Sequence, residues 1–127
     1  MTAKTSQASQ KFLTGKELDR AIANFLRKVG IPANLLGYDY LVEAIRVSYK
    51  DKSYVHNVTK TLYPEVAKIC KTTAPRLERA MRHAIEVAFD RGDMKFINEN
   101  FSYDHTRGKS TNSEFIADAV VYLKNNY

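Results

Sequence analysis

Cysteine is almost missing from this 127-residue sequence, and the one residue of this type, Cys70, cannot form an intramolecular disulfide. This excludes the small disulfide-stapled domains and is what we expect of a chain in a reducing cytosol. No apolar run approaches the roughly 20 residues that a membrane-spanning helix requires, so we expect no membrane partner. The first ten residues also lack the apolar core of a secretory signal. We therefore expect a cytoplasmic location.

Patterns typical of catalysis and of metal binding are lacking as well. The three histidines, His56, His83 and His105, do not show the spacing of metal ligands. The sequence has no glycine-rich phosphate loop, no nucleophile beside a general base and no recognisable pair of catalytic carboxylates. We interpret His56 and His105 as surface or capping residues and Cys70 as a buried apolar residue. The sequence therefore predicts neither an enzyme nor a protein that binds a metal ion or cofactor.

Positive charge is what the sequence has in excess. It contains 20 Lys and Arg against 14 Asp and Glu, which gives a formal net charge of +6. This surplus favours an anionic partner, and double-stranded nucleic acid is the commonest one for a small cytosolic domain. A lysine surplus also serves solubility, so charge alone leaves both interpretations open.

Apolar residues recur every three and four positions, which predicts an all-α domain of six or seven helices. Residues 1–13 are polar and are expected to form a disordered leader or linker remnant, while residues 14–127 form the helical domain. Capping boxes are expected at Thr14 with Glu17 and at Thr111 with Glu114. The predicted helices begin or run as follows: from Thr14 to Gly30, Tyr38–Lys50, Tyr54–Leu62, from Pro64, from Pro75 to Gly92, Asp93–Asn100 and from Thr111.

The segment from Tyr63 to Gly92 predicts a short helix, a tight turn and a longer helix, the order of elements in a helix-turn-helix. At about 100° per residue, the longer helix places its apolar residues on one arc: Leu77, Met81, Ala84, Ile85 and Ala88. The opposite side carries Arg76, Arg79, Arg82 and His83, with Glu78 on its flank. Because guanidinium groups match guanine edges and phosphates, we predict that the helix of about Pro75–Arg91 lies in the major groove of DNA.

The turn before this helix lacks the glycine that many such turns contain. It has Thr72 and Thr73 instead, whose hydroxyls, together with the helix N-terminal amides, can hold a phosphate. We also expect Lys71 to neutralise phosphate charge, together with Arg76 and Arg82. Thr72 and Thr73 are therefore candidate DNA-binding residues.

Two other interpretations of the basic helix remain. It can be an amphipathic helix with a solvated face on which Glu78, Glu86 and Asp90 pair with the arginines. Its basic face can also dock an acidic protein partner, which would make the chain a protein-interaction domain. The preference for arginine over lysine, the turn and the net charge together favour DNA.

Four blocks of the sequence closely resemble the C-terminal effector domain of the stage 0 sporulation protein A family of response regulators: GIPANLLGYDYLVEAI, VTKTLYPEVAK, TTAPRLERAMRHAIEVAFDRG and KSTNSEFIAD. The blocks follow one another at the family's spacing, and the match runs from about Gly15 to Tyr127. The resemblance implies a six-helix domain with an embedded helix-turn-helix that activates or represses transcription. It also implies binding to a TGTCGAA-type DNA box, often present as tandem copies on which the domain can form a tandem dimer, and a nucleoid-associated location.

The resemblance also assigns roles to individual residues. It implies that Glu78 and Arg79 contact bases, and that Arg82 and His83 bind near bases or the DNA backbone. The segment matching Arg91 to Phe101 is implied to contact the RNA polymerase sigma factor. Its matching residues are Gly92, Phe96, Asn98 and Phe101, although the sequence between the matching glycine and phenylalanine differs from the family's.

Two differences from the family bear on the fold and on regulation. Ser110 stands where family members usually have a proline, ahead of the last predicted helix. The family's phosphoacceptor receiver domain has no counterpart in these 127 residues, so we expect that phosphorylation does not regulate them directly.

Overall fold

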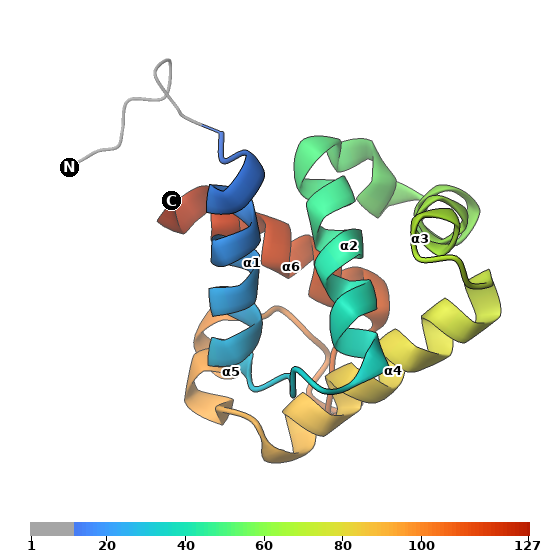
Figure 1. The fold of residues 1–127 in the computed structure, drawn as a ribbon. Coiled ribbons are helices and arrows are strands. Elements are labelled where there is room, and N and C mark those ends of the chain that lie inside the picture. Colours follow the sequence, from blue (N-terminus) through green and yellow to red (C-terminus); the bar gives the residue numbers. More distant parts are fainter. Residues whose placement is uncertain (1–11) are drawn as a thin grey trace.

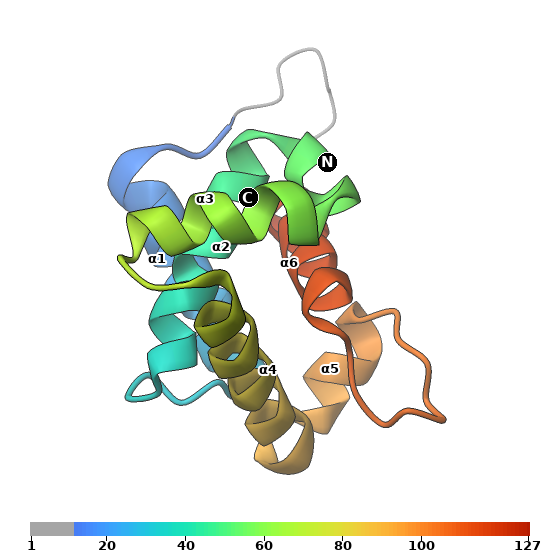
Figure 2. The ribbon, with the colours of Figure 1, turned by 90° about the vertical axis from the view of Figure 1, so that its right-hand side faces the viewer.

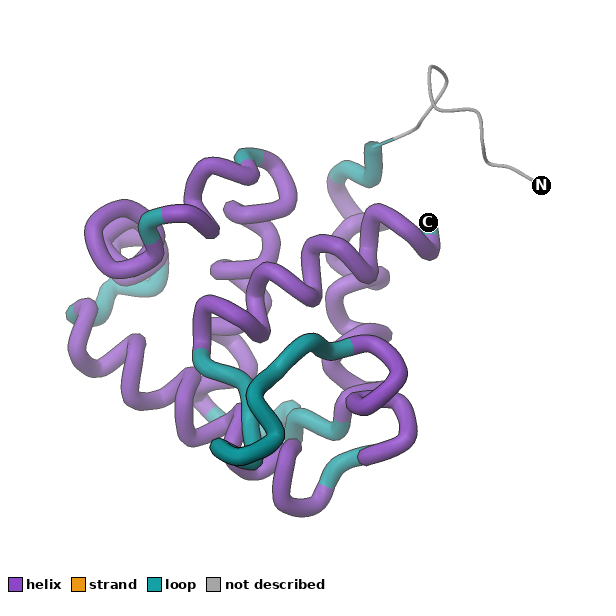
Figure 3. Tube along the Cα trace, turned by 180° about the vertical axis from the view of Figure 1, so that it is seen from behind, coloured by secondary structure: helices purple, strands orange, loops and turns teal. Residues whose placement is uncertain are grey.

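Six α-helices and no strand are present in residues 12–127, the part of the chain that the computed structural model describes (Figures 1 and 3). The predicted all-α class is therefore confirmed. None of the described helices is both long enough and apolar enough to cross a membrane. The helices are α1 (Gly15–Val29), α2 (Leu36–Lys50), α3 (Tyr63–Ile69), α4 (Ala74–Arg91), α5 (Met94–Asn100) and α6 (Asn112–Asn126).

The predicted leader of residues 1–13 lies, up to residue 11, outside the described residues. At its end the backbone N–H of Leu13 donates to the hydroxyl of Tyr49, at 3.0 Å. The side chain of Leu13 is half-buried and packs against the core. The last residue assigned to the leader is thus in contact with the helical domain.

Helix α2 is the central helix of the domain and packs against α1, α3, α4 and α6. The residues predicted to face inward from it are all buried: Leu41, Ala44, Ile45 and Ser48. Near its N-terminus Gly37 lies directly against α4, because a Cβ built there would come within 2.1 Å of the Ala80 carbonyl oxygen. Only glycine allows this close crossing, so Gly37 fixes how deeply α4 packs onto α2.

An aromatic cluster joins the ends of α1, α5 and α6. Phe25 is fully buried at its centre, with its ring centroid 5.8 Å from that of Phe101 and 5.9 Å from that of Phe115. Phe96 and Tyr122 pack on the same ring at 6.1 and 5.2 Å. Such ring pairs add stability beyond the burial of their apolar area. The cluster also contacts the C-terminal part of α4, where the Phe89 ring centroid lies 6.0 Å from that of Phe101.

One of the two predicted capping boxes forms. The Thr111 hydroxyl accepts from the Glu114 N–H at 3.2 Å, and the Glu114 carboxylate accepts from the Thr111 N–H at 2.9 Å. The box predicted at Thr14 is wrong, since the Thr14 side chain accepts no hydrogen bond from the helix that it precedes. The next residue, Gly15, has a φ of 53°, so the chain enters α1 by a different path from that of a standard N-cap.

The helix predicted over Tyr54–Leu62 is instead two short segments. A 3-10 turn covers Lys52–His56, and a wider π-type turn covers Val58–Leu62 and runs directly into α3. In the wide turn the Tyr63 N–H donates to the Val58 carbonyl, five residues back. The following residue is Pro64, which has no N–H to bond the carbonyl four residues back, and this favours the wider turn over a regular helix.

Candidate nucleic-acid interface

Helices α3 and α4 form the predicted helix-turn-helix, with α3 lying across the N-terminal end of α4 (Figure 2). The turn of residues 70–73 is closed by two backbone hydrogen bonds: the Thr72 N–H donates to the Ala67 carbonyl at 2.9 Å and the Lys71 N–H to the Lys68 carbonyl at 3.3 Å. This is the Schellman arrangement that commonly ends a helix, in which the residue after the C-cap is left-handed. That residue is Lys71, with a φ of 57°, where glycine is the usual choice.

The first turn of α4 is capped by the threonine before it. The hydroxyl of Thr73 accepts a hydrogen bond from the Arg76 N–H at 3.3 Å. Pro75 lies in the same turn, where its missing N–H has no partner to lose. Thr73 is exposed, so its hydroxyl can also donate to a ligand, while Thr72 is half-buried. The start of α4 therefore combines a capped first turn with an exposed hydroxyl.

The buried side of α4 is the predicted one. The five residues of its apolar arc have at most 1% of their surface exposed: Leu77, Met81, Ala84, Ile85 and Ala88. They pack against α2, α3 and α6. The orientation of α4 about its own axis is therefore fixed by the core, and so is the direction in which the opposite side chains point.

The opposite side of α4 presents the predicted basic residues together at the surface. Arg76, Arg79, Arg82 and His83 are exposed and Glu78 is half-buried. Within residues 12–127, Arg76 and Arg79 are not paired with a carboxylate. They lie three residues apart, beside an open hollow that Leu36 and Tyr40 line from the side of α2. Two unpaired guanidinium groups are thus presented side by side.

The three acidic residues of α4 do not all pair with arginines of the basic face, as the solvated-face interpretation requires. Glu78 pairs with Arg82, one turn further along the helix. Glu86 pairs with Lys109, which comes from the loop before α6. Asp90 forms an ion pair with its neighbour Arg91, with 3.6 Å between the Asp90 Oδ2 and the Arg91 Nε. The solvated-face interpretation therefore describes Arg82 but not Arg76 or Arg79.

The N-terminus of α6 is tied to the helix-turn-helix by Asn112, a residue that the sequence analysis did not single out. Its buried amide donates to the Tyr63 hydroxyl and to the Glu78 carbonyl, both at 3.1 Å. Burial raises the pKa of Tyr63, so the phenol remains neutral and keeps its proton. The block KSTNSEF offered the only signal, a polar residue directly after a helix N-cap.

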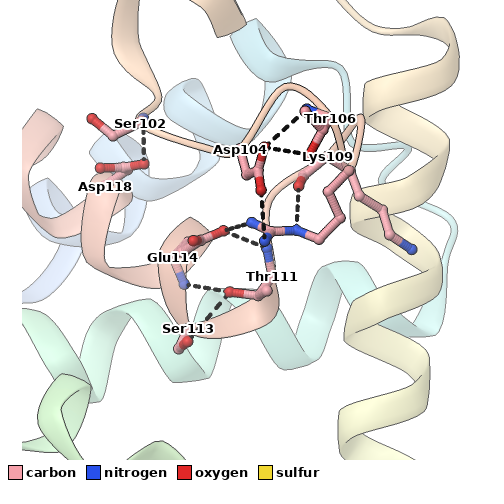
Figure 4. Close-up of polar contacts among 9 residues, drawn as sticks. Ser102, Asp104, Thr106, Lys109, Thr111, Ser113, Glu114 and Asp118 are labelled. Atoms are coloured by element: carbon pink, nitrogen blue, oxygen red, sulfur yellow. Dashed lines mark hydrogen bonds and ion pairs between the residues drawn. The ribbon is translucent and has the colours of Figure 1, made fainter.

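A cleft of about 250 Å³ lies between α4 and the start of α6. Arg82, Arg107 and Lys109 contribute to its walls, together with Ser110. Figure 4 shows the polar contacts of this region, in which a single carboxylate, that of Glu114, serves both the cap of α6 and the preceding loop. Ser110 is buried, and its hydroxyl has no hydrogen-bond partner among the described residues. The cleft is therefore basic but contains no nucleophile with an adjacent base.

The residues matched to sigma-factor contact are mostly parts of the fold. Phe101 is buried, and a Cβ at Gly92 would come within 2.3 Å of the Val29 carbonyl oxygen. Phe96 is half-buried in the aromatic cluster. Asn98 is exposed and accepts a hydrogen bond from the Tyr103 hydroxyl at 2.9 Å. Of these four residues, only Asn98 is exposed.

Cysteine and histidine do not gather into a site. Cys70 is half-buried at the end of α3, and burial raises the pKa of its thiol. His56 is exposed, and the ring of His105 lies 4.3 Å from that of Tyr103 in the loop before α6. Across residues 12–127 no group of three or more histidine, cysteine or acidic residues is arranged to hold a metal ion.

The family model of the sporulation initiation factor Spo0A C-terminal domain matches residues 22–123 of the chain. This range runs from the middle of α1 almost to the end of α6 and includes the whole helix-turn-helix. The chain therefore belongs to the Spo0A C-terminal family, as its sequence blocks indicated. It is a family of DNA-binding effector domains of sporulation regulators, and not a family of enzymes.

Proposed function

We propose that this member of the Spo0A C-terminal family is a sequence-specific transcription regulator that reads a TGTCGAA-type box with α4 in the major groove. One observation carries the proposal: Arg76 and Arg79 are exposed, lie close together on the outer side of a helix whose inner side is fixed by the core, and have no carboxylate partner among residues 12–127. An α-helix fits the major groove, and arginine bonds both guanine O6 and N7.

Arg79 is the residue that we assign to guanine. It lies in the second turn of α4, and the N-terminal half of a recognition helix is the part that reaches base edges. Because it has no carboxylate partner among residues 12–127, it can form two hydrogen bonds to a base without giving up an ion pair. A good bidentate contact discriminates against the wrong base by about 1–3 kcal/mol.

We assign the carboxylate of Glu78 to accept a hydrogen bond from the amino group of a cytosine. Arg82 is assigned to hold this carboxylate in position. The ion pair between them leaves one carboxylate oxygen of Glu78 for a base and reduces the repulsion between this carboxylate and the phosphates. Its backbone carbonyl is fixed by Asn112. Arg82 and His83 then contribute to backbone binding, while Thr72 and Thr73 offer hydroxyl donors to a phosphate at the start of α4.

Further properties follow as proposals from the same assignment. We expect a cytoplasmic, nucleoid-associated protein that binds tandem boxes as a dimer on DNA. Contact with an RNA polymerase sigma factor would go through the exposed Asn98 and the half-buried Phe96, while Gly92 and Phe101 hold that segment in shape. Whether the chain activates or represses then depends on where its box lies relative to the promoter.

A titration with the variant Arg79→Ala tests the assignment. The variant is measured by fluorescence anisotropy against a TGTCGAA-type duplex and a scrambled duplex of equal composition, at one fixed salt concentration. We expect a loss of preference for the box of about 1–3 kcal/mol, with weak binding to both duplexes retained. The matched control is Arg20→Ala, which removes an equal charge from the exposed side of α1. An equal loss on both duplexes would contradict base reading by Arg79.

A further inference from the structure

The loop of residues 103–110, between α5 and α6, has a defined conformation. The carboxylate of Asp104 accepts from the backbone N–H and the hydroxyl of Thr106, at 2.9 and 2.6 Å. Further along, Arg107 donates to the Lys109 carbonyl at 3.3 Å and to the Glu114 carboxylate at 2.6 Å (Figure 4). These bonds attach the loop to the first turn of α6 and determine where Lys109 lies.

The ammonium group of Lys109 is held against the outer side of α4. Its partner there is Glu86, seven residues after Arg79 and four after Arg82. Seven residues are close to two full helical turns, so Glu86 lies on the same side of α4 as Arg79, about 10 Å further along the axis. Lys109 is therefore placed beside the side of α4 that we assign to DNA, although it belongs to a different part of the chain.

We propose that this loop is a second DNA-contacting element, in which Lys109 bonds a backbone phosphate and Arg107 acts as its positioning residue. The inference rests on the proposed function, because it assumes that α4 lies in the major groove. A helix with its side chains is about 10–12 Å wide and fills a groove of about 12 Å. Cations held beside such a helix consequently face the phosphates of the flanking strand.

The ion pair with Glu86 is compatible with this role. An ammonium group has three N–H donors, and one bond to Glu86 leaves two for phosphate oxygens. Bonding to Lys109 also lowers the pKa of Glu86, so this carboxylate stays charged at neutral pH. Without Lys109, it would place a bare negative charge beside the phosphates. Lys109 thus has two separable effects, attraction of a phosphate and neutralisation of Glu86.

The first test measures salt dependence in Lys109→Gln. Binding to the TGTCGAA-type and scrambled duplexes is titrated at several salt concentrations. We expect weaker binding to both duplexes by the same factor, and a slope of log affinity against log salt that is shallower by about 0.9, the value of one phosphate contact. The control is Lys50→Gln, an exposed residue at the opposite end of α2 from Gly37, which packs on α4, and there we expect no change. A slope equal to that of the control would overturn the proposal.

The second test separates the two effects of Lys109. Glu86→Gln keeps an oxygen that can accept from Lys109 but removes the negative charge, and we expect it to bind both duplexes more tightly. The double variant Glu86→Gln with Lys109→Gln should then bind less tightly than Glu86→Gln alone, again with the shallower slope. If the double and single variants bind equally, Lys109 serves only to neutralise Glu86, and the phosphate contact is refuted.

These results are distinguishable from a failure of the proposed function. If the unaltered chain binds the box and the scrambled duplex equally, base reading fails, while the slopes of the Lys109 variants still report on the phosphate contact. If the unaltered chain prefers the box and Lys109→Gln behaves like Lys50→Gln, only the second contact fails.

Discussion

Helix α4 is flanked on its two sides by supports of different kinds. On the side of α2 the support is a close backbone contact, since Gly37 touches the Ala80 carbonyl and the Ala84 side chain. The arginines that border this side, Arg76 and Arg79, have no carboxylate partner within residues 12–127. On this side, therefore, the backbones of the two helices are in close contact, while the guanidinium groups at the surface have no carboxylate partner among the described residues.

On the side of α6 the support is polar. Asn112 donates to the Glu78 carbonyl, and the cations on this side, Arg82 and Lys109, are paired with Glu78 and Glu86. A cation without a partner can bond a base at once, whereas a paired cation must share its donors. This difference indicates a division of labour, in which the unpaired arginines read sequence on the α2 side. The α6 side holds Glu78 in position for its base contact and supplies attraction that does not depend on sequence.

The largest expected effect comes from breaking the α2 side with Gly37→Ala. The new Cβ would come within 2.1 Å of the Ala80 carbonyl oxygen, so α2 and α4 must move apart. We expect a loss of about 3 kcal/mol in the free energy of unfolding, at the upper end for overpacking, measured by urea denaturation. Gly108→Ala is the control, because no atom lies within 4 Å of its Cβ and only its left-handed φ of 82° opposes the change. A Gly37→Ala domain as stable as the control would contradict the close crossing.

The next largest effect is on preference for the box, and it is compared between Arg79 on the α2 side and Arg82 on the α6 side. Arg79→Ala should lower the preference for the box by about 1–3 kcal/mol, whereas Arg82→Lys, which keeps the charge and can keep an ion pair with Glu78, should lower it by less. Competition titrations of the box against scrambled duplex measure both. If Arg82→Lys loses as much preference as Arg79→Ala, Arg82 itself reads a base, and the proposed division of labour is wrong.

A smaller effect on the free energy of unfolding is expected from removing the cap at the start of α6, the helix that supports α4 through polar contacts. Thr111→Ala removes the hydroxyl that accepts from the Glu114 N–H, at a cost of about 1 kcal/mol in the free energy of unfolding. Thermal denaturation of this variant and of Ser113→Ala, whose hydroxyl accepts no helix N–H, measures the difference. Equal stability of the two variants would show that the cap contributes nothing.

The same cap predicts a dependence on pH. The Thr111 backbone N–H, and to a lesser extent Arg107, lowers the pKa of Glu114 below its ordinary value of 4.5. A carboxyl group whose pKa is lowered by folding stabilises the folded state at pH values above its ordinary pKa. This contribution is lost as the pH falls through the folded-state pKa. The stability advantage over Glu114→Gln should therefore be present at neutral pH and disappear on acidification below 4.5. An advantage that grows on acidification would contradict this account.

The smallest effect concerns the turn before α4. Lys71 adopts a φ of 57°, which glycine adopts without strain, so Lys71→Gly should stabilise the domain by about 0.5–1 kcal/mol. It should also weaken binding to every duplex by removing one positive charge. Lys71→Ala separates the two effects, since it loses the same charge without the relief at φ. A decrease in stability on Lys71→Gly would contradict the assigned turn.

The sequence was sufficient to predict the six α-helices and the sides of α4, because both follow from local periodicity, but the seventh helix predicted over Tyr54–Leu62 is wrong. The apolar arc from Leu77 to Ala88 and the cap at Thr111 are set by residues within a few positions of one another. The failed cap at Thr14 depended on the unusual φ of Gly15, and the wide turn before Pro64 on a hydrogen bond five residues back. Gly15 and Pro64 are compatible with these geometries, but the residue types alone did not specify them.

The contacts that position the site could not be predicted, because they join distant parts of the chain. Asn112 reaches Glu78 across 34 positions, and Lys109 reaches Glu86 across 23. Gly37 was visible only as a glycine near the start of a helix, and its contact with α4 depends on how the two helices cross. Periodicity predicts which side of a helix is buried, but it does not predict which distant residue lies beside the exposed side.

A direct titration of the unaltered chain tests the central claim, that α4 reads a specific box. Fluorescence anisotropy is recorded against a TGTCGAA-type duplex and its scrambled copy at two salt concentrations. We predict tighter binding to the box at both concentrations, with affinity for both duplexes falling as salt rises. Equal affinity for the two duplexes at both concentrations would contradict it, because the exposed arginines of α4 would then contact only phosphates.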